Sequence, residues 1–222
     1  MKPADATKPG LPRHQATAEG GHGRNSKAGP VPSTSSAAAA HTYSASSSHL
    51  TAVAPADAVE AVDAEMFRQA LGRHPAGVAI VTLNGPTGPA GLTVTSFSSA
   101  SLDPPLVSFY IGHSSSNWPA VQVARHFAVN LMGHGQQELA ARFARKGEDR
   151  FGPATQWWTG PAGLPLLAGA TVHMICATDS LVTIGDHELI VGRVVEASIG
   201  TSDIPLLHHR GQFTRPALAP HA

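Results

Sequence analysis

The chain lacks several features that would point to particular classes of function. Cys176 is its only cysteine, which excludes an intramolecular disulfide and a four-cysteine zinc site. The 15 Lys and Arg residues balance the 15 Asp and Glu residues, and no basic run points to nucleic acid or to a membrane surface. No apolar run reaches the ~18 residues that a membrane-spanning helix needs. We therefore expect a cytoplasmic protein that binds neither nucleic acid nor a membrane.

Familiar catalytic motifs are missing as well. The sequence has no Gly-x-Ser-x-Gly elbow, no Gly-rich phosphate loop ending in Gly-Lys and no His-Glu-x-x-His. The neighbouring His208 and His209 would point to opposite faces of a strand and could not bind one ion. Residues 133–135 (Gly-His-Gly) imitate the start of a dinucleotide-binding fingerprint, but Glu138 occupies the third glycine position and the βαβ alternation is missing. We expect neither a metal site nor a Rossmann fold.

Residues 1–58 differ in composition from the rest of the chain. Ala, Ser, Gly, Pro and His dominate this segment, which has almost no large apolar side chains. Such a segment cannot bury enough surface to offset the entropy lost on ordering. We predict a disordered low-complexity tail over residues 1–58 and a single domain over residues 59–222.

The predicted domain reads mainly as short strands separated by turn residues. Three short helices are expected, over residues 63–72 with Asp63 as N-cap, 118–125 and 136–146. The expected strands cover 78–83, the start of 91–105, 106–111, 127–132, 170–183 and 187–199, with a tight turn at 184–186. Many strands and few helices predict an antiparallel sheet or barrel.

The segment 91–105 begins as a strand and continues as a row of hydroxyl-bearing residues, namely Thr93, Thr95, Ser96, Ser98, Ser99 and Ser101. Because alternate side chains of a strand share a face, Thr93, Thr95 and Phe97 are expected to point one way, opposite to Val94. Hydroxyls beside an aromatic ring suit a flat ligand with polar edges and a phosphate. The alternative is a Ser/Thr-rich edge strand that runs into a turn.

Two other polar segments are candidates for ligand contacts. Residues 114–116 are three serines before an expected helix, where free backbone N–H groups favour an anion; alternatively, Ser116 only caps the helix. Asp186 and His187 form the one titratable pair at a tight turn; alternatively, they are a turn aspartate and a surface histidine. Trp157 and Trp158 lie on a turn-like segment, which favours a dimer contact or a core plug.

Taken in order, these segments resemble the flavin reductase family over about residues 66–213. The matching motifs are Phe67-Arg68, Pro75-x-Gly77-Val78, Thr93-Val94-Thr95-Ser96-Phe97, Ser101-Leu102-Asp103-Pro104-Pro105, Ser114 to Ser116, Phe127 to Leu131, Asp149-Arg150-Phe151, and Gly185-Asp186-His187 with Gly192. The resemblance implies a mainly β, antiparallel FMN-binding split barrel with short helices. It also implies an NAD(P)H-dependent reductase of FMN or FAD that supplies reduced flavin to a separate flavin-dependent monooxygenase.

The resemblance further implies residue roles. His187 is expected to be the catalytic residue, positioning the nicotinamide of NADH or NADPH. The expected flavin contacts are Thr93, Val94, Thr95, Ser96, Phe97, Ser98, Ser99, Ser114, Ser115, Ser116, Phe127, Asn130, Arg150, Phe151 and Asp186. Family members imply a homodimer, here through the Trp pair and the late strands.

The sequence departs from the family at two places. Ala76 stands where the family usually has Thr, and His208 and His209 where Tyr is commoner. These departures leave open the choice of NADH or NADPH and the cover over the flavin. A protein of the same fold that carries or senses FMN without turning over NAD(P)H is the alternative function. The Gly-Asp-His turn favours the reductase, because a carrier needs no nicotinamide contact.

Overall fold

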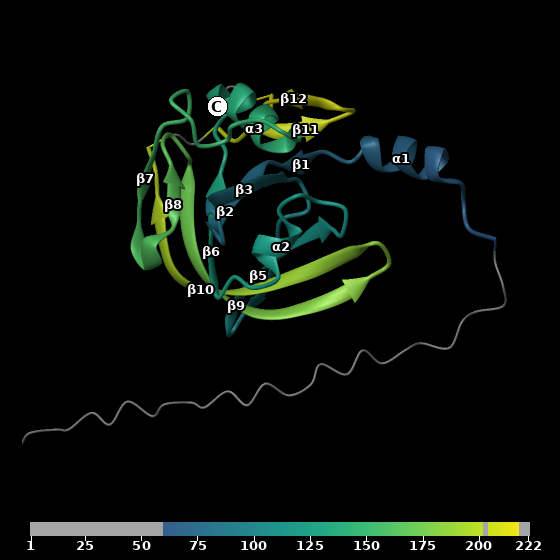
Figure 1. Cartoon of the computed structure of the whole chain (residues 1–222). Coiled ribbons are helices and arrows are strands. Elements are labelled where there is room, and N and C mark those ends of the chain that lie inside the picture. The colour runs from purple at the N-terminus through teal and green to yellow at the C-terminus, as the bar shows by residue number, and fades with distance from the viewer. Residues whose placement is uncertain (1–59, 202–203, 218–222) are drawn as a thin grey trace, which may run out of the picture. The chain divides into compact units, whose positions relative to one another are not determined.

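The computed structural model describes residues 60–201 and 204–217 (Figure 1). The tail predicted over residues 1–58 and its boundary with the domain lie outside these residues. No helix in the described part of the chain combines the length and apolarity needed to cross a membrane.

A seven-stranded antiparallel sheet forms the body of the domain, in the order β3-β2-β6-β9-β10-β5-β4 (Figure 1). Its strands are β2 (Ala79–Gly85), β3 (Gly88–Val94), β4 (Ser98–Leu102), β5 (Pro105–Gly112), β6 (His126–Leu131), β9 (Val172–Ile184) and β10 (His187–Ile199). The sheet curls until β3 comes into contact with β5, which makes a barrel that is open beside its edge strands β3 and β4. The predicted mainly β, antiparallel fold is confirmed.

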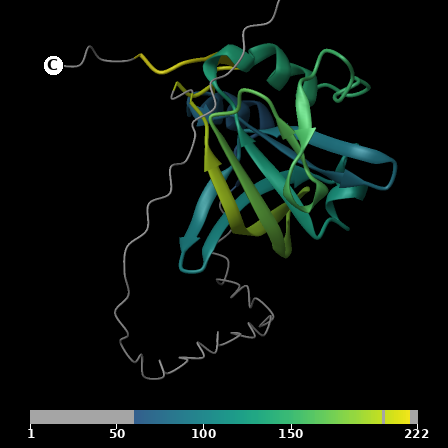
Figure 2. The same cartoon turned by 90° about the vertical axis from the view of Figure 1, so that its left-hand side faces the viewer.

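Smaller elements cover this barrel. A three-stranded sheet contains β1 (Ala76–Gly77), β11 (Leu207–His209) and β12 (Gln212–Thr214), and a hairpin pairs β7 (Trp157–Thr159) with β8 (Pro165–Leu167). The helices are α1 (Ala64–Gly72), α2 (Trp118–Val121) and α3 (Gln137–Ala144), with 3-10 turns η1 (His134–Gln136) and η2 (Pro161–Gly163). Both views place α3 and the β11–β12 ribbon at the same end of the barrel (Figures 1 and 2).

Helix boundaries follow partly from local sequence. Asp63 caps α1 as predicted, since its Oδ1 accepts a hydrogen bond of 2.8 Å from the Met66 backbone N–H. In contrast, α2 ends at Val121, four residues before the predicted end. A distant contact explains this early end: Thr178 of β9 donates its hydroxyl to the Ala124 carbonyl (2.7 Å) and its backbone N–H to the Arg125 carbonyl (2.9 Å). Because these two carbonyls accept hydrogen bonds from β9, the segment does not continue as a helix and the chain passes into β6.

Three buried apolar clusters hold the sheet and its covering elements, and the two larger ones lie next to the hydroxyl-rich segment. Inside the barrel, Phe109 packs edge-on against Phe127, with ring centroids 5.4 Å apart. Gly192 lies directly against the Phe127 ring, where a Cβ atom would collide with it. Cys176 is fully buried beside these rings, and burial raises the pKa of its thiol to about 12. The predicted role of Cys176 as a small buried apolar residue is confirmed.

The second core lies under α3. Phe143 of α3 approaches β3 so closely that a Cβ on Gly91 would lie 2.8 Å from the Phe143 Cε1 atom. Phe151 packs edge-on against Phe143, with centroids 5.2 Å apart. Gly91 thus allows α3 to lie against the strand that carries the hydroxyl-rich segment.

Candidate active site

The hydroxyl-rich segment crosses from β3 to β4, and its side chains separate into internal and accessible ones. Thr93 donates its hydroxyl to the Ala140 carbonyl of α3 (2.6 Å), and the Ser96 hydroxyl accepts from the Tyr110 N–H (3.0 Å). Val94 is buried in the barrel core. Thr95, Ser98 and Ser99 are exposed, with Ser98 donating its hydroxyl to the Ser99 carbonyl (3.2 Å). The accessible hydroxyls are therefore those just after the end of β3 and at the start of β4.

Phe97 does not lie where strand alternation predicts. It is half-buried and packs against the barrel core instead of sharing an open face with Thr93 and Thr95. The reason is that β3 ends at Val94 and the backbone turns before β4 begins at Ser98. The two-residue period stops with the strand, so the prediction for this side chain was wrong.

A first cavity, of about 380 Å³, brings the hydroxyls at the end of β3 close to α1. Its lining includes Thr95 and Ser96 on one side, Phe67 and Leu71 of α1 on another, and His208 of β11. The apolar face of α1 is not buried within the described residues: Phe67 is 54% exposed and Leu71 57%. This cavity therefore combines hydroxyl donors with apolar walls, which suits the edge and face of a flat aromatic ring.

A second cavity, of about 610 Å³, brings Ser116 together with Arg150 and Phe151. The hairpin turn between β2 and β3, with Thr87, forms another of its walls. Ser114 and Ser115 begin the same loop but do not line this cavity; Ser114 is exposed, and the Ser115 hydroxyl accepts from the Asn117 N–H (3.3 Å). Asn117, not Ser116, is the N-cap residue of α2, and it makes no side-chain capping bond.

Arg150 is the residue of the second cavity whose bonding is incomplete. Its Nη2 donates to the Arg145 carbonyl (2.7 Å), whereas its buried Nε is the one buried side-chain N or O atom without a partner in the described part of the chain. Burial lowers the pKa of its guanidinium. A buried donor without an acceptor is rare in proteins, and a water or an ion can supply the missing acceptor. The guanidinium of Arg150 suits an anionic group such as a flavin phosphate, whereas Glu148 and Asp149, which also line the cavity, would repel one.

Phe127 and Asn130 line neither cavity, contrary to the predicted contacts. Asn130 is fully buried: its Nδ2 donates to the Ile80 carbonyl and to the Thr82 hydroxyl (both 3.0 Å), and its Oδ1 accepts from the Leu167 N–H (2.9 Å). Phe127 is 3% exposed, inside the barrel. Asn130 therefore joins the sheet to β8 and Phe127 fills the barrel core, and neither side chain is free to contact a ligand.

The tight turn between β9 and β10 carries Asp186 and His187. The Nδ1 of His187 lies 2.7 Å from Asp186 Oδ1, and a hydrogen bond from His187, followed by the charge of that ring, lowers the pKa of Asp186. Because a carboxylate only accepts hydrogen bonds, Nδ1 carries the proton. The Nε2 atom lies near Gly112: a Cβ atom added to this glycine would be 3.5 Å from Nε2. The imidazole side chain is 48% exposed, and Nε2 makes no hydrogen bond within the described part of the chain.

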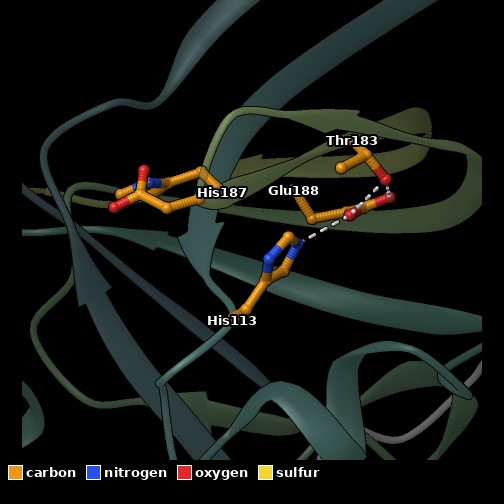
Figure 3. A network of polar contacts seen from close by, with 5 residues as sticks. His113, Thr183, His187 and Glu188 are labelled. Atoms are coloured by element: carbon orange, nitrogen blue, oxygen red, sulfur yellow. Dashed lines mark hydrogen bonds and ion pairs between the residues drawn. The ribbon is translucent and has the colours of Figure 1, made fainter.

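A second imidazole–carboxylate pair lies beside this turn and was missed in the sequence. His113 Nε2 is 3.1 Å from Glu188 Oε2, and the Thr183 hydroxyl donates to the same carboxylate at 3.1 Å and 3.3 Å (Figure 3). Glu188 is only 8% exposed. Alternation along β10 could have signalled it, since Glu188 shares a face with the buried Ile190.

Comparison with known proteins identifies the class to which this fold and site belong. Residues 71–217 match the family described as flavin reductase like domain. The chain belongs to this family, and it is an oxidoreductase.

Relatives and solved structures that resemble the chain bear the names of flavin oxidoreductases or reductase subunits. The chain is 45% identical to an NADH:FMN oxidoreductase of Rhodococcus erythropolis over 154 residues, which is 68% of this chain and 80% of the relative. It is 38% identical to HsaB, the reductase subunit of a flavin-dependent monooxygenase of Rhodococcus jostii, over 157 residues (71% and 80%). The NADH:FAD oxidoreductase of Streptomyces globisporus, solved in complex with NAD and FAD fragments, superposes with a TM-score of 0.66 at 35% identity (74% and 99%).

Proposed function

We propose that this protein uses NADH to reduce FMN or FAD and that the reduced flavin serves a separate flavin-dependent monooxygenase. The observation that carries the proposal is the half-exposed His187, whose Nδ1 is fixed by Asp186 and whose Nε2 is left for a ligand. A flavin carrier would have no use for such a group. The names of the relatives support NADH as the reductant and a monooxygenase as the consumer.

In this proposal the flavin lies along the opening of the barrel. Thr95 and Ser96, with nearby backbone groups, hold the edge of the isoalloxazine ring in the first cavity. Ser116 and Arg150, which both line the second cavity, hold the phosphate there through hydrogen bonds that the guanidinium charge strengthens. Ser98, Ser99, Ser114 and Ser115 are proposed to contact the ribityl chain or the phosphate. Of the remaining expected contacts, Phe151 lines the second cavity and Asp186 holds His187, while Thr93, Val94, Phe97, Phe127 and Asn130 support the site from within the fold.

His187 is proposed to orient the nicotinamide. With Nδ1 bonded to Asp186, Nε2 can hydrogen-bond the carboxamide in either charge state of the ring, accepting from its NH₂ group or donating to its oxygen, and this fixes one ring face toward the flavin. The cofactors supply the hydride transfer itself, from nicotinamide C4 to flavin N5. The protein needs no general base for this step; its residues bind, orient and exclude water.

We also propose a homodimer. Trp157 and Trp158 of β7 are 37% and 46% exposed, and Val195 and Ile199 of β10 are 56% and 88% exposed. A second copy covering these side chains would remove a sizeable apolar area from water. Sedimentation at micromolar concentration with flavin present tests this idea, and a monomer would refute it. The cytoplasmic location stays a prediction from the sequence.

The proposed activity is tested by following NADH oxidation at 340 nm with FMN, with FAD and without flavin. A reductase oxidises NADH only when flavin is added, and omission of oxygen leaves reduced flavin as the product. NADPH in the same assay measures the preference for the nicotinamide. Tight flavin binding in fluorescence titrations without NADH or NADPH oxidation would replace the reductase by a flavin carrier of the same fold.

A further inference from the structure

Glu188 is a carboxylate in a position where a strand of this kind normally carries an apolar side chain. It follows His187 on β10, so the two side chains point to opposite faces of the sheet, His187 outward and Glu188 inward. Removing a carboxylate from water is unfavourable unless hydrogen bonds compensate for the lost hydration. Thr183, its cross-strand partner on β9, and His113 supply those bonds (Figure 3).

These bonds join two segments that are far apart in the sequence. His113 begins the loop that carries Ser114 to Ser116, and Glu188 lies next to the turn that carries His187. A backbone bond runs in parallel, from the His113 N–H to the Asp186 carbonyl (3.1 Å). The His113 ring also lies against Trp118 at the start of α2, with centroids 5.7 Å apart. His113 is thus fixed from three sides.

We propose that His113 and Glu188 are positioning residues, whose contact holds the serine loop and the Asp186–His187 turn in register with each other. The inference rests on the proposed function, in which the loop binds the phosphate or ribityl part of the flavin and the turn binds the nicotinamide. Neither residue needs to touch a ligand. The β5–β10 ladder, which ends with Gly112 opposite His187, aligns the two strands, and the side-chain contact extends this alignment to the loop and the turn. Misplacement by about 1 Å can slow a reaction by as much as ~100-fold.

Two substitutions at one position separate positioning from simple stability. In Glu188→Gln, the amide oxygen still accepts from His113, and the amide NH₂ can donate to the Thr183 hydroxyl. In Glu188→Leu, the side chain fills a similar volume but accepts no hydrogen bond. We expect single-turnover flavin reduction at saturating NADH to fall roughly tenfold in Glu188→Leu and to stay within about twofold of wild type in Glu188→Gln.

A partner variant tests whether the two residues act as a unit. His113→Phe keeps an aromatic ring against Trp118 and the backbone bond to Asp186 but removes the donor to Glu188. Its reduction rate should match that of Glu188→Leu, and the double variant should be no slower than either single variant. Additive losses in the double variant would contradict a shared role.

Thr178→Val is the matched control, because it removes a hydroxyl–carbonyl bond of 2.7 Å on β9, the strand that pairs with β10, away from the turn. It should lower the melting temperature without changing the reduction rate of the folded enzyme. If it slows reduction as much as Glu188→Leu does, the effect is general destabilisation and the positioning role is refuted.

A second readout does not depend on catalysis. Hydrogen–deuterium exchange of peptides over residues 113–117 and 183–187 should speed up in Glu188→Leu and His113→Phe, and remain slow in Glu188→Gln and Thr178→Val. Unchanged exchange and unchanged reduction in Glu188→Leu would overturn the proposal. In a further outcome, the wild-type protein fails to oxidise NADH while Glu188→Leu still speeds up exchange in both segments. That result would refute the proposed function but support the role of the His113–Glu188 contact in holding the two segments together.

Discussion

Replacement of His187 by Ala should weaken the use of NADH while leaving flavin binding almost unchanged. The imidazole offers one hydrogen bond through Nε2, and its side chain is 48% exposed, so its removal disturbs little packing. Losing one hydrogen bond to a ligand costs roughly 0.5–1.5 kcal/mol. At 1.36 kcal/mol for each factor of ten, kcat/KM for NADH should fall by about two- to twelvefold.

Flavin affinity provides the internal comparison for this variant. The proposed flavin contacts are the hydroxyls at the end of β3 with Ser116 and Arg150, and none of them bonds to His187. The Kd from quenching of flavin fluorescence should therefore stay within about twofold of wild type. His126→Ala is the matched control, since His126 is also exposed but begins β6. It should change neither quantity.

A second substitution tests the same contact without removing the imidazole. Gly112→Ala would place a methyl group 3.5 Å from His187 Nε2, an ordinary contact that leaves the backbone unstrained but partly covers the nitrogen. NADH use should weaken as it does in His187→Ala. If both variants retain wild-type kinetics with NADH, the Gly-Asp-His turn is only a turn, and our assignment of the nicotinamide contact is refuted.

Three other outcomes follow from the structure. Arg150→Gln should weaken flavin binding by roughly tenfold or more, the value of a charge-assisted bond, in the same fluorescence titration; unchanged affinity would remove the phosphate from the second cavity. Asn130→Leu should lower the free energy of unfolding by about 1–3 kcal/mol in urea, because it leaves the Leu167 N–H without a partner. Cys176 should resist a thiol reagent at pH 8 until the protein unfolds; because its pKa is raised to about 12 from 9.0, stability should also fall as pH rises through that range.

The local features of the fold could be predicted from the sequence because neighbouring residues determine them. Asp63 was expected to cap α1, and its side chain does so. The tight turn at Gly185 and Asp186 was expected between two long strands, and β9 ends at Ile184 while β10 begins at His187. Alternation and turn residues carry these signals over a few positions, and no distant contact overrides them.

The parts that were missed depend on residues far apart in the chain. The early end of α2 depends on Thr178, more than fifty residues later. The structural role of Asn130 depends on Ile80, Thr82 and Leu167, which no local pattern connects. The His113–Glu188 pair spans 75 positions, so its members could be recognised only once the topology had brought β5 beside β10.

The position of the β9–β10 hairpin has a consequence for the order in which the chain can fold. This hairpin comes last among the strands of the large sheet, yet it lies in the middle, between β6 on one side and β5 on the other. During synthesis from the N-terminus, the pieces β3-β2-β6 and β5-β4 therefore cannot form backbone hydrogen bonds with each other, and the edges of β6 and β5 stay unpaired. Only when residues up to about Ile199 have left the ribosome can one insertion join both pieces. A chain cut before Val172 should consequently remain aggregation-prone, although it contains five of the seven strands.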